Sequence, residues 1–256
     1  RFMKTLEKKI DFLVVGTAKS GTTSLFHSIK NHPKIFIPEQ KEMNFFNNTV
    51  DKTKKGATEK FSEDMVDYIS SVKDFNNNYN NASIDQKKGD ITPTYLFNYK
   101  YTIPLIKKYC SDKVKIIIFL RNPIDRTHSH YLHFIREGWE KETLFDALNM
   151  EEERLKSGFS YRYSYKGYSK YYKQVKAFQD NFSNVKIFLF EELFTNQFFK
   201  EFFEFIEVED FKVSKVIKTN STGLPKSKFL QWSLNFFRKS KFIVKVLKKM
   251  GSGPLY

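Results

Sequence analysis

The sequence predicts an α/β fold of three layers (α/β/α), in which helices cover both faces of a central parallel sheet. Three short segments, Asp11–Gly16, Lys113–Leu120 and Val185–Phe190, each contain a continuous apolar run, as expected of strands that are buried on both faces. Segments with helical character separate them, and alternating strands and helices form parallel sheets between two helical layers. A length of 256 residues suits a single domain over residues 1–256.

The first strand and the first helix are predicted on either side of a turn. Asp11–Gly16 (DFLVVG) is the strand, and Thr22–Lys30 (TTSLFHSIK) is the helix that follows. The helix stops at His32-Pro33, because a residue that precedes proline avoids helical backbone. Ile35–Ile37 is predicted as a brief strand.

The later elements follow from the same patterns. Lys113–Leu120 (KVKIIIFL) is the strongest strand, and Pro123 suits the first turn of the helix behind it. The polar segment Asp51–Asn81 is predicted as a surface excursion around a helix near Glu63–Val72. Further helices are expected over Asp125–Arg136, Leu144–Lys156, Lys170–Asp180 and Phe198–Ile206, and a basic amphipathic helix over Lys226–Met250 in the C-terminal tail, residues 226–256.

The chain is strongly basic, with 44 Lys and Arg against 29 Asp and Glu and a net charge of +15. Such a surface attracts nucleic acid, anionic membranes, acidic polysaccharides and phosphorylated cofactors. Because there is no zinc-ligand spacing and no glycine–aromatic RNA-binding signature, nucleic acid is not expected as a partner. The tail is expected to dock on its own domain, with peripheral membrane contact as the minority interpretation.

Cysteine and hydropathy patterns favour a cytoplasmic location. Cys110 is the only cysteine, so an intramolecular disulfide is impossible and a reducing compartment is favoured. No apolar run is long enough to span a membrane. Since the sequence begins with Arg1 rather than Met, an upstream signal or anchor stays an open alternative.

The turn Gly16–Leu25 (GTAKSGTTSL) has the composition of an anion site. Its backbone N–H groups and the positive end of the following helix form a cradle for a negative group. Two glycines would let the backbone approach the ligand, and one lysine and several hydroxyls add donors: Gly16, Gly21, Lys19, Ser20, Thr22, Thr23 and Ser24. The alternative is a turn that uses glycine, serine and threonine only to cap the helix.

This loop differs from the phosphate loop of nucleotide triphosphatases. In that loop the lysine follows the second glycine, whereas Lys19 precedes Gly21. The strand Lys113–Leu120 also ends in Arg121 rather than in an aspartate for magnesium, so a metal-free donor fits better. An ATP-dependent kinase of the P-loop type is the rival enzyme, and a basic adapter that binds nucleic acid or anionic lipid through Tyr161–Tyr172 and the tail is the rival without catalysis.

A second motif, RNPIDRTHSHY over Arg121–Tyr131, stands at the end of the central strand. Together, KSGTTSL and RNPxDRxxSxY resemble the 5′-phosphosulfate and 3′-phosphate motifs of sulfotransferases that use 3′-phosphoadenosine 5′-phosphosulfate (PAPS). The heparan-sulfate and bacterial carbohydrate branch is the most similar, over about Phe12 to Lys226. The resemblance implies a P-loop-like sulfotransferase fold and a metal-free transfer from PAPS to a hydroxyl, or in second place an amine, of a carbohydrate or small metabolite. The other product would be adenosine 3′,5′-bisphosphate.

The resemblance also assigns donor-binding residues. Lys19 and the backbone around it would hold the phosphosulfate, and Arg121 with Ser129 would bind the 3′-phosphate, for which a guanidinium is well suited. A loosely matching GxY segment adds Tyr168, and a late loop adds Gly223 and Lys226. The implied set is Lys19, Ser20, Gly21, Thr22, Thr23, Ser24, Arg121, Ser129, Tyr168, Gly223 and Lys226.

Two further segments resemble the acceptor side of the family. Pro38–Phe46 contains Lys41 and Glu42 in a KExxFF pattern, in which the glutamate serves as the base that an attacking alcohol needs and the lysine neutralises sulfuryl oxygens. The alternative is a solvated surface pair. Gly89–Tyr95 makes Asp90 a second catalytic candidate, with N-capping or ion pairing as its alternative.

Ile91 and three histidines limit these assignments. Ile91 stands where heparan-sulfate enzymes commonly have an active-site lysine, which disfavours a heparan-type acceptor. His128, His130 and His133 lie on the predicted helix after Arg121, and no matching ligand pair accompanies them. They are interpreted as helix-surface or pocket-lining residues, and no metal site is expected.

Overall fold

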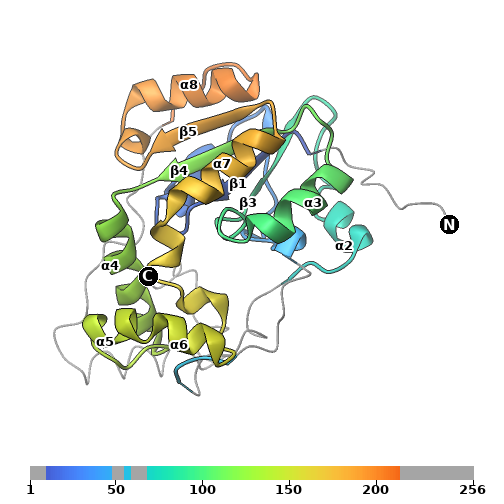
Figure 1. The fold of residues 1–256 in the computed structure, drawn as a ribbon. Coiled ribbons are helices and arrows are strands. Elements are labelled where there is room, and N and C mark those ends of the chain that lie inside the picture. The colour runs from blue at the N-terminus through green and yellow to red at the C-terminus, as the bar shows by residue number, and fades with distance from the viewer. Residues whose placement is uncertain (1–9, 48–54, 59–67, 214–256) are drawn as a thin grey trace, which may run out of the picture.

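The computed structural model describes residues 10–47, 55–58 and 68–213, and its core is a sheet of five parallel strands (Figure 1). The strands are β1 (Phe12–Gly16), β2 (Ile35–Phe36), β3 (Lys87–Ile91), β4 (Lys115–Leu120) and β5 (Val185–Leu189). Their order is β2-β3-β1-β4-β5, and every neighbouring pair is parallel. The predicted α/β fold with a central parallel sheet is therefore confirmed.

Helices cover both faces of this sheet. They are α1 (Thr22–Ile29), α2 (Val72–Asn77), α3 (Tyr99–Tyr109), α4 (Pro123–Glu137), α5 (Leu144–Asn149), α6 (Glu151–Lys156), α7 (Tyr171–Asn181) and α8 (Asn196–Ile206). In Figure 1, α3 and α7 lie in front of the sheet and α8 lies along its upper side.

The side chains of β1 alternate between two apolar cores. Leu13 packs in a core with residues of α3 and α7, and Val14 packs in a core with residues of α1 and α8. All five residues of β1 are buried. This alternation is the period of two that a strand imposes, and it explains why both helical layers depend on the same central strand.

Several elements differ from the sequence prediction. β3 and α3 were not predicted. The strand β3 (KKGDI) was missed because it begins with two lysines and carries no apolar run. The predicted helix Leu144–Lys156 is two helices, α5 and α6, which meet at Met150. Most of the helix expected near Glu63–Val72 cannot be compared, and the described helix α2 begins at Val72, where the Ser71 hydroxyl accepts a bond from the Asp74 N–H (3.0 Å). Residues 59–67 and the C-terminal tail lie outside the described residues.

A smaller core forms at one end of the sheet around α4, α5 and α6 (Figure 1). Phe134 of α4, Ala147 of α5 and the buried tyrosines Tyr163 and Tyr165 form it. α4 starts directly after β4 because the Asn122 side chain caps its first turn. Among the helices that the structure describes, none is long and apolar enough to cross a membrane.

Candidate active site

A cavity of about 350 Å³ lies where three strands end. Its wall contains residues of the segments that directly follow β1, β4 and β5, among them Lys19, Arg121 and Phe190. In the sheet order β2 and β3 lie on one side of β1, and β4 and β5 lie on the other. Open parallel sheets bind ligands at such a switch point, outside the carboxyl ends of their strands.

The loop after β1 supplies much of the cavity wall. From the predicted donor-binding set, the lining residues are Lys19, Gly21, Thr22, Thr23 and Ser24, whereas Ser20 is fully buried behind the wall. The hydroxyls of Ser20 and Thr17 are buried and have no hydrogen-bond partner in the described part of the chain. The first residues of α1 line the cavity, so the positive end of this helix lies at the cavity wall. Gly21, which precedes the helix, has no side chain to cap its first N–H groups.

The glycines of this loop are required by protein packing. Gly21 has a φ of 83°, and a β-carbon there would lie 2.6 Å from Cδ2 of Leu193. A β-carbon on Gly16 would lie 2.5 Å from the β-carbon of Leu96. Packing against Leu96 and Leu193 therefore requires glycine at both positions, apart from any approach to a ligand.

Lys19, which carries the positive charge of the loop, has an unfavourable backbone conformation and a lowered pKa. Its φ of 72° lies in the left-handed region, which costs a non-glycine residue about 1–2 kcal/mol. Burial and, next in weight, the Arg136 guanidinium lower the pKa of Lys19 to about 8. An anion bound beside this ammonium would favour its charged form again, which couples the protonation of Lys19 to ligand binding.

Arg121 follows β4 and is held over the loop. Its Nη1 donates to the Lys19 carbonyl (3.1 Å), and its guanidinium lies 4.5 Å from the centre of the Phe190 ring. The Tyr171 hydroxyl fixes the backbone by donating to the Arg121 carbonyl (2.9 Å). The Nε of Arg121 is buried without a hydrogen-bond partner among the residues described. A positioned guanidinium with a spare buried donor fits a phosphate.

Ser129 and His130 line the cavity from α4, and each is only 5% exposed. Arg126 Nη1 lies 3.2 Å from His130 Nδ1. Because a guanidinium only donates, Nδ1 is the acceptor and the ring proton is on Nε2. Burial, reinforced by the Arg126 charge, holds the pKa of His130 well below its usual range, so this histidine is neutral. His133 also lines the cavity, whereas His128 is exposed.

Tyr168 lines the cavity and is buried, with its ring stacked on Phe97 (centroids 4.1 Å apart, planes 4° apart). The Glu151 carboxylate holds the preceding turn by accepting a bond from the Gly167 N–H (3.1 Å). Three tyrosines of the segment Tyr161–Tyr172 are at most 1% exposed. These buried rings are not available to stack on nucleic-acid bases, so the adapter hypothesis loses that part of its support.

Glu42 is the carboxylate in the cavity wall, and Lys41 stands beside it outside the wall. The Lys41 ammonium contacts the Glu42 carboxylate, and the Glu42 side chain is 37% exposed. Burial favours protonation of Glu42, but the charges of Lys41, Arg162 and Lys19 outweigh it and lower the pKa of this carboxyl. Glu42 is therefore ionised at neutral pH and able to accept a proton.

Asp90, the second predicted carboxylate, lies behind the wall in β3. It is 1% exposed, and its oxygens accept bonds from the Thr92 and Tyr95 hydroxyls (2.8 Å each). Burial raises the pKa of Asp90 to about 6 despite these bonds. Asp90 is not in the cavity wall, and Ile91 beside it packs in the core. The contacts of Asp90 are therefore structural.

Several cavity residues had no predicted role. They are Arg162, Trp139, Phe134, Phe190, Phe194, Pro93 and Thr94. Phe190 follows the end of β5 just as Arg121 follows β4. The rule that ligands bind outside the carboxyl ends of parallel strands could therefore have identified it. The predicted contacts Gly223 and Lys226 lie outside the described residues. Within the described ranges, no group of three or more His, Cys, Asp or Glu side chains could hold a metal ion.

Comparison with known proteins identifies relatives of this chain. A curated relative is the membrane-associated sulfotransferase kil1 of Dictyostelium discoideum, which is 29% identical over 147 residues. That match covers 57% of this chain and only 27% of the relative's length.

Solved structures agree with the observed fold. A sulfotransferase from Alicyclobacillus acidocaldarius has a TM-score of 0.72 at 27% identity, over 95% of this chain and 94% of the other. Mouse sulfotransferase SULT7A1, solved with PAP, shares the fold with a TM-score of 0.51 at 16% identity, over 96% and 84% of the two chains. A family model described as the sulfotransferase domain matches residues 9–246. Because that model covers most of its length, the chain belongs to the sulfotransferase family and is a sulfotransferase enzyme.

Proposed function

We propose that this enzyme transfers a sulfuryl group from PAPS to a hydroxyl, or in second place an amine, of a carbohydrate or small metabolite. The observation that carries the proposal is the pairing of two anion sites at one switch point of the sheet. The loop after β1 brings Lys19 and the positive end of α1, and the segment after β4 brings Arg121 and Ser129. A single domain and a cytoplasmic location are part of the same proposal.

The residues of the cavity fit a donor with two anionic groups. Arg121 has a buried Nε without a partner among the described residues, and Ser129 adds a hydroxyl from α4; we assign both to the 3′-phosphate. Lys19, Thr22 and Thr23 are assigned to the phosphosulfate. When bound, PAPS supplies the activated sulfuryl group. No metal is required by these assignments.

The transfer requires a base for the acceptor proton and a positive charge that stabilises the departing phosphate. As the acceptor oxygen bonds to sulfur and the bond from sulfur to the bridging oxygen breaks, the acceptor proton passes to the Glu42 carboxylate. Lys19 stabilises the negative charge that remains on the departing phosphate. Lys41 keeps Glu42 ionised, because its ammonium lowers the pKa of that carboxyl. Asp90 keeps a positioning role through Thr92 and Tyr95.

A calorimetric titration with adenosine 3′,5′-bisphosphate in the presence of EDTA tests the proposal. The bisphosphate is expected to bind without metal, and Arg121→Ala is expected to lower its affinity by about 10- to 100-fold, since charge-assisted bonds contribute about 1.5–3 kcal/mol. Lys113→Ala is the matched control, because this exposed lysine precedes β4 at its opposite end. It removes the same charge and is expected to leave the affinity unchanged.

Two outcomes would contradict the proposal. Binding of ATP with magnesium but not of the bisphosphate would favour the kinase hypothesis. An equal loss of affinity in Arg121→Ala and Lys113→Ala would mean that the anion responds only to the net charge of the protein.

A further inference from the structure

The loop that follows α4, residues 138–142, is held unusually firmly and places Trp139 in the cavity wall. α4 ends at Glu137, and the φ of 71° at the following Gly138 turns the chain back. The N–H groups of Trp139 and Glu140 then both donate to the Phe134 carbonyl (2.9 and 3.2 Å). The backbone on both sides of the indole is therefore fixed to the end of the helix.

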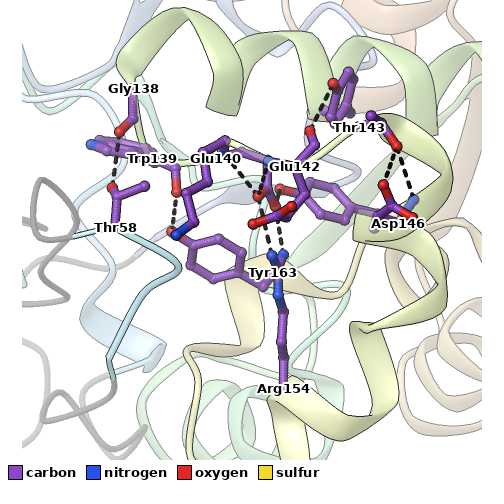
Figure 2. A network of polar contacts seen from close by, with 12 residues as sticks. Thr58, Gly138, Trp139, Glu140, Glu142, Thr143, Asp146, Arg154 and Tyr163 are labelled. Atoms are coloured by element: carbon purple, nitrogen blue, oxygen red, sulfur yellow. Dashed lines mark hydrogen bonds and ion pairs between the residues drawn. The ribbon is translucent and has the colours of Figure 1, made fainter.

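A buried ion pair anchors this loop from below (Figure 2). The Glu140 side chain is fully buried and accepts two bonds from the Arg154 guanidinium, at 2.5 and 3.2 Å. It also accepts bonds from the Tyr165 hydroxyl (2.9 Å) and from the N–H groups of Lys141 (2.9 Å) and Glu142 (3.1 Å). A buried carboxylate with this many donors is fully satisfied, so it fixes the loop in one conformation.

Two hydroxyls hold the loop from its sides, as Figure 2 shows. Thr58 donates to the Gly138 carbonyl (2.9 Å), and Tyr163 donates to the Trp139 carbonyl (2.7 Å). The indole packs edge-on against Phe134 and His133, with ring centres 5.2 and 5.8 Å away. These contacts present Trp139 to the cavity as a rigid aromatic surface.

The position of Trp139, just after the end of α4, places it beyond the proposed donor site. Ser129, assigned to the 3′-phosphate, is eight residues before the end of the helix at Glu137, which corresponds to about 12 Å at a rise of about 1.5 Å per residue. Arg136 and Glu137 influence the pKa of Lys19, so this end of α4 is near the residue assigned to the transferred group. Trp139, Glu42 and Arg162 line the same cavity.

We propose that Trp139 contacts the acceptor and determines which acceptors the enzyme takes, with Glu140, Arg154 and Tyr163 as positioning residues. A rigid indole that lines the same cavity as a carboxylate and a guanidinium suits a ring-shaped acceptor such as a pyranoside, which offers an apolar face to the indole and hydroxyls to Glu42. This inference rests on the proposed function.

The two tryptophans of the chain, Trp139 and Trp232, allow a direct binding test. In Trp232→Phe the indole of Trp139 is the only one, and its fluorescence is titrated with a panel of methyl pyranosides and linear diols in the presence of adenosine 3′,5′-bisphosphate. We expect a saturable emission change with pyranosides that are turned over with PAPS, and none with linear diols. The same titration of Trp139→Phe, which retains Trp232, is expected to show no change.

A matched pair of hydroxyl deletions separates positioning of the acceptor from positioning of the donor. Tyr163→Phe removes the bond to the Trp139 carbonyl, and Tyr171→Phe removes the equivalent bond to the Arg121 carbonyl. Tyr163→Phe is expected to raise the acceptor KM roughly 3- to 10-fold without changing bisphosphate affinity. Tyr171→Phe is expected to lower bisphosphate affinity by a similar factor without changing the acceptor KM. A merely structural role would shift both quantities together.

The inference is overturned if only linear acceptors or none of the panel is turned over, if Trp139→Phe leaves the acceptor KM unchanged, or if both tyrosine variants change the same quantity. Failure of the proposed function is distinguishable, because the bisphosphate would then not bind the unaltered enzyme in the calorimeter.

Discussion

The two sides of the cavity are built in different ways. The side that we assign to the donor consists of segments that directly follow β1 and β4, so Lys19 and Arg121 lie close to the ends of these strands. The side that we assign to the acceptor consists of Glu42 and Trp139, which lie in two loops, and of Arg162, which lies in the short 3-10 helix Tyr161–Tyr163. The loop of Trp139 is fixed by the buried Glu140 carboxylate rather than by strand pairing.

This difference shows how one fold can combine a donor side with a fixed geometry and an acceptor side whose sequence can vary. Strand ends in a parallel sheet have fixed spacing and direction, so a donor site built on them requires few additional contacts. Loops have no such support, and here buried carboxylates supply it: Glu140 holds residues 138–142, and Glu151 holds the turn before Tyr168. We infer that the acceptor side can change in sequence while the donor side stays intact.

The largest separation of the two sides is expected from Glu42→Gln. Loss of a general base lowers turnover by about 10²- to 10⁴-fold, whereas bisphosphate affinity should stay nearly constant or rise slightly, because a negative charge near Lys19 is removed. Steady-state kinetics and calorimetry measure the two quantities. Glu39→Gln, an exposed neighbour, serves as the control. Full turnover in Glu42→Gln would transfer the base role to another group, with the cavity residue His133 as the next candidate.

Breaking the anchor of the acceptor side is expected to have the next largest effect. Arg154→Met leaves the Glu140 carboxylate buried without its ion-pair partner, which costs about 3–5 kcal/mol of folding free energy. Lys156→Met, two residues away, breaks an exposed pair with Glu152 (2.8 Å) and should cost less than about 1 kcal/mol. Urea unfolding measures both. Equal destabilisation by the two variants would show that the buried pair does not anchor the loop.

The difference between the two sides also explains what could be predicted from sequence. The apolar runs of β1 and β4 predicted two buried strands of a parallel sheet, and the motifs at their ends named Lys19, Arg121 and Ser129, all of which line the cavity. Such residues are predictable because the sheet geometry brings strand ends together without further information. β3 escaped prediction, since Lys87 and Lys88 conceal a strand whose buried part is only three residues long.

The acceptor side was less predictable because its geometry depends on long-range pairs. Arg154 and Glu140 are 14 residues apart, and no local pattern indicates that their charges are buried together. Asp90 illustrates the converse case: its motif predicts a catalytic carboxylate, and in the structure it is buried and accepts bonds from two hydroxyls. Whether a carboxylate faces a cavity or the core is decided by packing that the motif does not contain.

Two glycines with similar backbone angles test how tightly the donor loop is packed. Gly21 (φ 83°) and Gly158 (φ 85°) are both in the left-handed region, but only at Gly21 would a β-carbon collide with neighbours, among them Leu193. Gly158→Ala should cost about 1–2 kcal/mol for the backbone alone, and Gly21→Ala about 1–3 kcal/mol more for overpacking. Thermal and urea unfolding compare them. Equal costs would mean that Leu193 and Phe190 move aside freely.

The smallest expected effect is a pH dependence confined to the donor side. Burial lowers the pKa of Lys19 to about 8 in the ligand-free enzyme, and a bound anion raises it again. Protons therefore bind together with the anion, so bisphosphate affinity is highest below pH 8. It should fall by up to about tenfold per pH unit above that value, until the pKa of the complex is reached. Calorimetry between pH 7 and 9.5 measures this slope of bisphosphate affinity against pH.

The control is Lys19→Met, which should bind the bisphosphate more weakly and show a flat pH profile over this range. A slope that persists in that variant would assign the titration to another group. The fluorescence of Trp139 with a pyranoside should not follow this titration, because the acceptor carries no charge for Lys19 to meet.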